Sequence, residues 1–163
     1  MNNQVVRDFV LILLVYAICG GLVYAAVAGN WPAELGVQPG IGDTDQLLTA
    51  DEFKNGFQTW AGIVAGLSLL CMILWYVLGE WGPRANKVSA GGWLITWFLL
   101  LLVVMLAVLG AFFMGPKASE HGEILAAFYF FIGVFFYYWA SVLLSPTSTK
   151  YTVPGSKMLR RSW

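Results

Sequence analysis

The side chains that could do chemistry in this chain are few and scattered. His121 is the only histidine, and it lies beside Glu120 and Glu123. A zinc site needs three or four protein ligands, and a haem bundle needs axial ligands within its helices. We therefore interpret His121 as an exposed side chain at the start of a helix, and we predict no metal site and no cofactor.

Two other patterns are weaker still. Asp43 and Asp45 follow a pair of glycines but lack the glycine and the bidentate glutamate of an EF-hand loop, so we predict an Asx-type turn. Cys19 and Cys71 lie in separate apolar stretches and are interpreted as packing residues. Since no carboxylates, histidines and cysteines converge on one place, we do not expect an enzyme, and we infer no soluble small-molecule substrate.

The composition indicates whether water or lipid surrounds these residues. Of 163 residues, 59% are hydrophobic and 11% are charged. A soluble domain carries roughly 25% charged residues, so lipid must cover most of this protein. The net charge is zero, which gives no reason to expect a nucleic acid partner. The sequence predicts an all-α integral membrane protein.

Four apolar runs, each long enough to span the bilayer, occur at 9–28, 60–78, 92–113 and 124–144. Each must be helical, because lipid offers no partner for an open strand. No run contains an ionisable residue, and proton relays and ion-coupled transporters usually need one at depth. We predict a single four-helix transmembrane domain over residues 1–163, without pump or ion-coupled transport machinery.

The first run resembles a secretory signal, since Arg7 precedes it and Ala26–Ala28 ends it with an A-x-A pattern. It is longer than the apolar region of about 7 to 15 residues that such signals contain. We expect it to be retained as a helix.

Lysine and arginine predict the orientation, because cytoplasmic loops carry an excess of both. One side of the predicted bundle holds most of them: Arg7, Arg84, Lys87, Lys150, Lys157, Arg160 and Arg161. The other side holds Lys54 and Lys117 among most of the acidic residues. We expect both termini and the tail 145–163 in the cytoplasm, the loop 29–59 outside, and the location to be the inner membrane of a bacterial cell.

The outer loop is expected to contain irregular turns over 30–46, followed by a capping box at Thr49 and Glu52. Phe53 and Phe57 follow at helical spacing. We predict one continuous helix over 50–78, with a short amphipathic extension that protrudes on the outer side.

Small residues recur every four positions in the first span, and the second span carries a GxxxG pattern. Such stripes let helices approach closely in a bilayer. They mediate either packing of the first span on the second or contact with another subunit, and packing within the chain is the simpler interpretation. These helix-packing residues are Ala17, Gly21, Ala25, Gly29, Gly62 and Gly66.

The fourth span has more aromatic surface than one small bundle can bury, so we expect it to face lipid, a protein partner, or a lipophilic ligand such as a quinone or carotenoid. The selected surface residues are Phe128, Phe131, Phe135, Tyr138 and Trp139. The basic tail residues Lys157, Arg160 and Arg161 would contact anionic lipid or a partner.

Together these patterns predict a non-catalytic accessory or scaffolding subunit of a larger membrane complex. Its partners would be lipids and other membrane-protein subunits, different or identical. Three alternatives remain at this point: a homo-oligomeric channel or transport component, a membrane immunity protein, and a subunit that binds a lipophilic cofactor in an electron-transfer complex.

Overall fold

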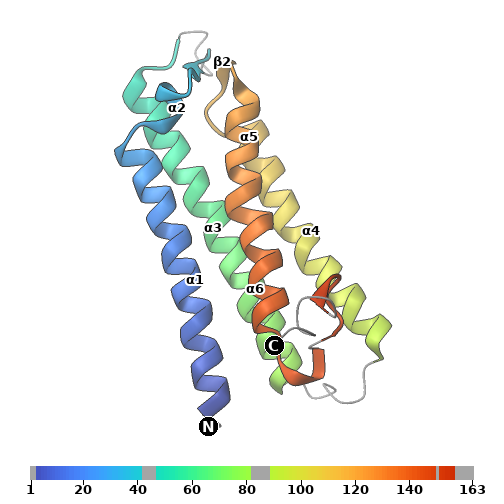
Figure 1. Cartoon of the computed structure of the whole chain (residues 1–163). Helices are drawn as coiled ribbons and strands as arrows, with labels where there is room; N and C mark the ends of the chain where they lie inside the picture. The colour runs from blue at the N-terminus through green and yellow to red at the C-terminus, as the bar shows by residue number, and fades with distance from the viewer. Residues whose placement is uncertain (1–2, 42–46, 82–88, 150, 157–163) are drawn as a thin grey trace.

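The computed structural model describes residues 3–41, 47–81, 89–149 and 151–156. Within these residues the chain forms four long helical rods that run alternately up and down (Figure 1). The first three rods are the single helices α1 (Asn3–Ala28), α3 (Ala50–Trp81) and α4 (Ala90–Met114). The fourth rod has three consecutive parts, which are α5 (Gly122–Phe130), η1 (Phe131–Phe135) and α6 (Phe136–Leu144). The all-α expectation is confirmed.

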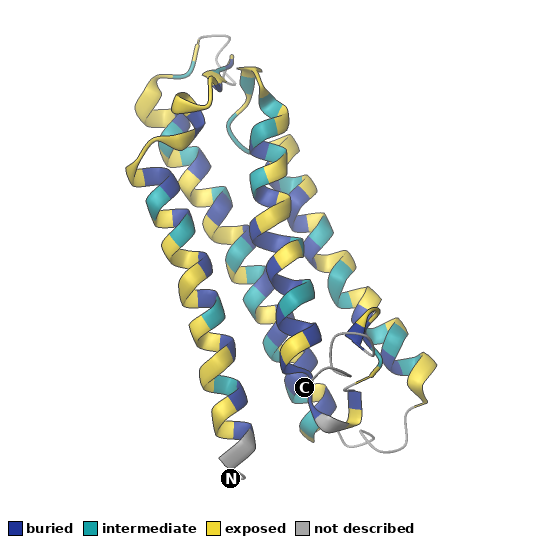
Figure 2. Cartoon of the chain, viewed as in Figure 1, coloured by how far each residue is buried: buried dark blue, intermediate teal, exposed yellow. Residues whose placement is uncertain are grey.

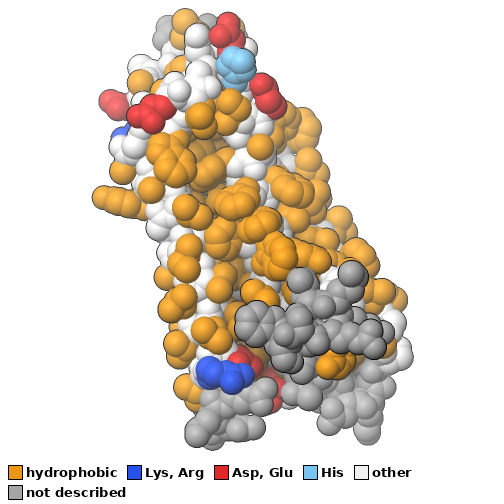
Figure 3. All heavy atoms as spheres, viewed as in Figure 1, with side chains coloured by type: hydrophobic (Ala, Val, Ile, Leu, Met, Phe, Trp, Pro, Cys, Tyr) orange, Lys and Arg blue, Asp and Glu red, His pale blue; other side chains and the backbone are white. Residues whose placement is uncertain are grey.

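All four rods are long and apolar enough to cross a membrane, over Val5–Ala28, Ala50–Trp81, Ala90–Met114 and Gly122–Leu144. Apolar side chains cover the length of the molecule in Figure 3, and the charged ones drawn there lie near its two ends. The chain is a multi-pass membrane protein.

The centre of the bundle is α3, which packs against α1, α4 and the η1 and α6 parts of the fourth rod. In Figure 1, α1 and α4 lie on opposite sides of the pair formed by α3 and the fourth rod. Figure 2 shows buried residues on the inward sides of the rods and exposed ones outside. We call the end where α1 begins and α6 ends the N-terminal end, and the opposite end the loop end.

The core toward the N-terminal end is built from aromatic residues whose polar atoms are paired. The Nε1 atoms of Trp75 and Trp97 donate to the hydroxyls of Ser145 and Ser141, both at 2.9 Å. The rings of Trp97 and Tyr137 stack with their centroids 5.9 Å apart. Because lipid cannot satisfy a buried N–H group, the serines of α6 and its C-cap let tryptophans serve as core residues here.

The loop end is more ordered than the sequence predicted. A one-turn helix α2 (Trp31–Glu34) leads to strand β1 (Gln38–Pro39), which pairs antiparallel with β2 (Ala118–Glu120). The Gly40 amide also donates to the Lys117 carbonyl at 2.7 Å. The prediction of irregular turns is therefore wrong for these segments, because their pairing depends on the distant second loop.

The start of α3 agrees with the prediction. The Thr49 amide donates to Glu52 Oε2 at 2.9 Å, and the Glu52 amide donates to Thr49 Oγ1 at 3.3 Å, which is a capping box. The helix then runs without a break to Trp81. Phe53 and Phe57 in its first turns are both buried.

The chain after α6 folds back on the bundle rather than extending from it. A 3-10 turn, η2 (Thr147–Thr149), lies against Gly79 of α3, whose carbonyl accepts a hydrogen bond from Ser148. The Tyr138 hydroxyl donates to the Pro154 carbonyl at 2.9 Å, and Val153 is buried. The described residues 145–149 and 151–156 thus include several that pack against the bundle. The basic residues predicted to bind lipid or a partner, Lys157, Arg160 and Arg161, lie outside the described residues.

Candidate functional surfaces and sites

The fourth rod is interrupted at its middle by the π-helical turn η1, where the sequence predicted an unbroken helix. The Ser68 hydroxyl donates to the Gly133 carbonyl at 2.9 Å, and Cys19 Sγ contacts the Ile132 carbonyl at 3.7 Å. Tyr16 Oη lies 2.8 Å from Ser68 Oγ. π-turns occur often at functional sites, and here the turn offers two carbonyls to the neighbouring helices.

This polar cluster joins three rods in the interior of the bundle. Ser68 is fully buried on α3, and it links Tyr16 of α1 to Gly133 of η1. Hydroxyl, thiol and carbonyl groups make up the cluster, and none of them is a strong acid or base at neutral pH. The arrangement therefore fixes the register of the helices and does not itself supply acid–base chemistry.

A buried carboxylate lies near the N-terminal end of the bundle. Asp8 is 6% exposed and accepts hydrogen bonds from Tyr76 Oη at 3.0 Å and from Arg7 Nη2 at 3.1 Å. The candidate membrane-spanning helix Val5–Ala28 includes both Arg7 and Asp8, which precede the predicted span 9–28, and the sequence did not predict this buried carboxylate. Spacing could have revealed it, since Asp8 shares a helix face with Val5 and Ile12.

Three of the four glycines selected for helix packing, Gly21, Gly62 and Gly66, face away from the rest of the chain. A Cβ atom added at Gly21, Gly62 or Gly66 would meet nothing within 4 Å. The interpretation that these glycines pack the first span against the second is therefore wrong, although α1 and α3 do pack together through other residues. Contact with another subunit stays a prediction.

The other three small residues of that stripe differ among themselves. Ala17 is exposed like Gly21, whereas Ala25 is partly buried. Gly29 lies at the turn after α1, where an added Cβ would come within 2.9 Å of the Trp31 ring. The stripe is therefore continuous in sequence but open only over its first half.

The selected aromatic residues also divide into two groups. Phe131 and Phe135 are exposed and stack with centroids 4.7 Å apart, and Trp139 follows 6.0 Å from Phe135. We call these three residues the aromatic strip. Phe128 instead packs on Phe57, with centroids 5.3 Å apart, and the Tyr138 hydroxyl is bonded to the C-terminal segment.

His121 is exposed and is the N-cap residue of α5, with a positive φ of 56°. This agrees with the prediction of an exposed side chain at the start of a helix. The Nδ1 atom of His121 lies 3.2 Å from Glu123 Oε1. Among the described residues no group of three potential ligands could hold a metal ion. Asp43 and Asp45, considered for calcium, lie outside the described residues.

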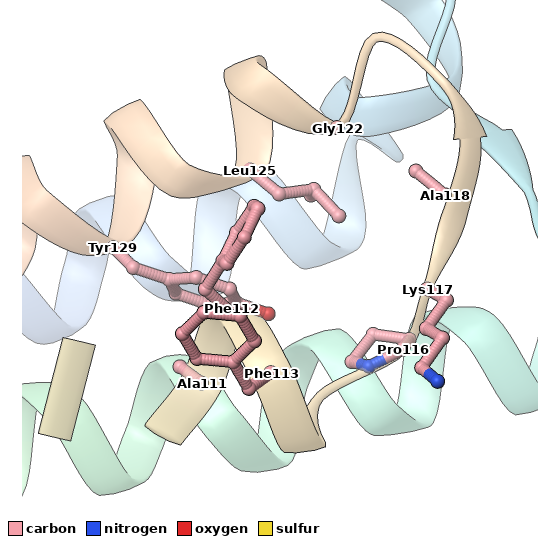
Figure 4. A pocket seen from close by; sticks show the side chains of 9 residues that line it. All are labelled: Ala111, Phe112, Phe113, Pro116, Lys117, Ala118, Gly122, Leu125 and Tyr129. Atoms are coloured by element: carbon pink, nitrogen blue, oxygen red, sulfur yellow. The ribbon is translucent and has the colours of Figure 1, made fainter. Parts of the chain in front are cut away.

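A pocket of about 310 Å³ opens at the loop end, between the last turn of α4, the following loop and α5 (Figure 4). Its walls are mostly apolar and aromatic. The lining residues are Ala111, Phe112, Phe113, Pro116, Lys117, Ala118, Gly122, Leu125 and Tyr129. None of them was among the predicted site residues, because the hollow forms only where α4 and α5 fold against each other around the loop that joins them.

Comparison with protein-family models, with curated proteins and with solved structures finds no match for this chain. The function must therefore be argued from its own residues.

Proposed function

We propose that this chain is a non-catalytic accessory subunit of a membrane complex, and that it packs against its partner through the outward glycines of α3 and α1. The observation that carries the proposal is the open space outside Gly62 and Gly66, where an added Cβ would meet nothing. The glycines form a GxxxG pattern on one face of a helix that lies in the middle of the bundle.

The physical reason lies in how helices associate in lipid. Lipid tails are as apolar as leucine, so helix association depends on close packing and on small residues that permit it. Glycine in a helix is also less favourable than alanine by roughly 0.5 to 1 kcal/mol. A pair of exposed glycines therefore weakens the isolated chain, and a partner helix that approaches closely would offset that loss.

Two further surfaces support a role in assembly. Ala17 and Gly21 give α1 a second smooth, exposed patch. The aromatic strip on the fourth rod supplies large, rigid contact area of the kind that protein interfaces favour. Ala17, Gly21, Gly62 and Gly66 are all exposed, so these small residues remain available to a partner.

The test is a double substitution, Gly62→Leu with Gly66→Leu, in the full chain carrying a tag at its C-terminal end. Both wild type and variant are extracted from the native membrane in mild detergent, and the mass and composition of each particle are measured. We expect the wild type to bring a stoichiometric partner, either another protein or a second copy, and the variant to lose it. The variant should still fold, because leucine is a better helix former and enters open space.

Val103→Leu is the matched control, since it adds bulk at an exposed position of α4. It should leave the complex intact. Recovery of the wild type as a bare monomer would overturn the proposal, and so would a double variant that keeps its partner.

A further inference from the structure

The pocket at the loop end contains a polar group whose hydrogen bond is missing. Tyr129 is 1% exposed, and its hydroxyl finds no hydrogen-bond partner among the described residues. The other buried tyrosine hydroxyls described above are paired, Tyr16 with Ser68 and Tyr76 with Asp8. Burying a hydroxyl without a partner is costly, so the Tyr129 hydroxyl, like that of Ser156 in the described residues, requires a reason.

The walls beside Tyr129 suit a ligand that is flat or apolar. Phe112 and Phe113 line the same pocket, and they are 46% and 67% exposed, so neither ring is fixed by a packed core. In Figure 4 the rings of Phe112, Phe113 and Tyr129 come from two different rods. Aromatic rings favour offset stacking on another flat ring, and mostly apolar pockets with one or two polar groups are typical ligand sites.

The charges around the pocket favour an uncharged head group. Lys117 is the one charged residue of the lining. Glu120 and Glu123 are both exposed on the adjoining strand and helix, and their negative charges offset the positive charge of Lys117 at this end of the bundle. The pocket also lies where one candidate membrane-spanning helix, α4, ends and the next, beginning with α5, starts.

We propose that this pocket binds an uncharged membrane amphiphile whose head carries a carbonyl oxygen, with the Tyr129 hydroxyl donating a hydrogen bond to that carbonyl. Two sources share this chemistry: the ring of an isoprenoid quinone and the ester of an acylglycerol lipid. The site uses α4 and α5 and does not depend on the glycines of α3, so it stands apart from the proposed role in assembly.

The experiment measures binding of two probes to the purified full chain in detergent, a short-tailed quinone and a monoacylglycerol. Tyr129→Phe removes only the hydroxyl and relieves a buried unpaired group, so it should fold at least as stably as the wild type. We expect it to bind the probe about 3- to 10-fold more weakly, which is the loss of one hydrogen bond. Tyr24→Phe, at a position that is 75% exposed, is the matched control and should bind as the wild type does.

A second variant separates the two sources. Phe112→Leu removes a flat wall of the pocket at a half-exposed position that should not affect folding. If Phe112→Leu binds the quinone more weakly but the monoacylglycerol as the wild type does, the ligand is a quinone ring. If Tyr129→Phe weakens binding of the monoacylglycerol, the ligand is a lipid ester. The proposal is overturned if neither probe binds, or if Tyr129→Phe binds both as tightly as Tyr24→Phe does.

Discussion

At the scale of single residues, the interior of this bundle depends on small polar groups placed opposite aromatic ones. Ser141 and Ser145 accept from tryptophans, and Ser68 connects Tyr16 to a backbone carbonyl. In lipid no water can replace a lost hydrogen bond to these groups. Each hydrogen bond therefore favours the one arrangement of helices in which it forms. Ser68 is the most demanding case because it bonds to two other rods at once.

Ser68→Ala should therefore destabilise the protein by about 1 to 3 kcal/mol, because it leaves both the Tyr16 hydroxyl and the Gly133 carbonyl without this partner. The loss would be measured by unfolding in detergent with increasing SDS. Thr59→Ala is the control, since the Thr59 hydroxyl bonds only within its own helix at an exposed position, and it should change little.

A Tyr16→Phe and Ser68→Ala double variant should lose less stability than the sum of the two single variants, because the two side chains share one bond. Additive losses, or equal losses from Ser68→Ala and Thr59→Ala, would contradict the network.

At the scale of elements, the π-turn η1 decides how closely the fourth rod approaches its neighbours. Gly133 lies in this turn, and an added Cβ there would come within 2.8 Å of Val64 Cγ1 and 3.1 Å of Val108 Cγ2. Both valines are buried. Position 133 therefore requires glycine, because the valines of the neighbouring helices leave no room for a Cβ atom. At Gly66 no atom of the chain would contact an added Cβ atom.

The same substitution should have opposite effects at these two glycines. Gly133→Ala should destabilise by about 1 to 3 kcal/mol through overpacking. Gly66→Ala should stabilise the isolated chain by about 0.5 to 1 kcal/mol, because alanine is the better helix former and meets open space. Both are read from SDS unfolding of the purified monomer.

Val64→Ala in the Gly133→Ala background should recover part of the loss by making room for the new methyl group. A Gly133→Ala variant as stable as the wild type would show that the fourth rod does not approach α3 and α4 this closely.

At the scale of the whole molecule, the charges indicate how the bundle sits in its membrane. Lys117 and the exposed acids Glu120 and Glu123 lie at the loop end, and Arg7 lies at the N-terminal end. Basic residues favour the cytoplasmic side. Lys54 lies near the start of α3, at the loop end, and the remaining basic residues of the sequence come after α3 or α6 in the chain, and both helices end at the N-terminal end. The loop end should therefore face outward.

Cysteine labelling in intact cells tests this orientation. Ser119→Cys and Ser89→Cys are placed singly in a chain whose buried Cys19 and Cys71 are replaced by alanine; both new positions are exposed, at opposite ends of the bundle. A membrane-impermeant maleimide should label Ser119→Cys in intact cells and Ser89→Cys only after the membrane is opened. The reverse pattern would show that the bundle is inverted.

The sequence by itself determined the number of long apolar rods, their approximate positions in the chain and the start of α3. These features are local: lipid forces each apolar run to satisfy its own backbone, and the capping box closes over four residues. Long apolar runs therefore predict spans without any knowledge of how the helices pack. The same reasoning placed His121 as an exposed side chain at a helix start.

Only the tertiary structure decided which way each helix turns its small and polar residues. A glycine stripe has the same spacing whether it faces the core or the lipid, and in a bilayer both surroundings are apolar, so hydrophobicity does not mark the inner face. Contacts between distant segments decide several features that the spacing of residues does not. These are the outward direction of Gly62 and Gly66, the burial of Asp8, the pairing of β1 with β2 and the unpaired Tyr129 hydroxyl.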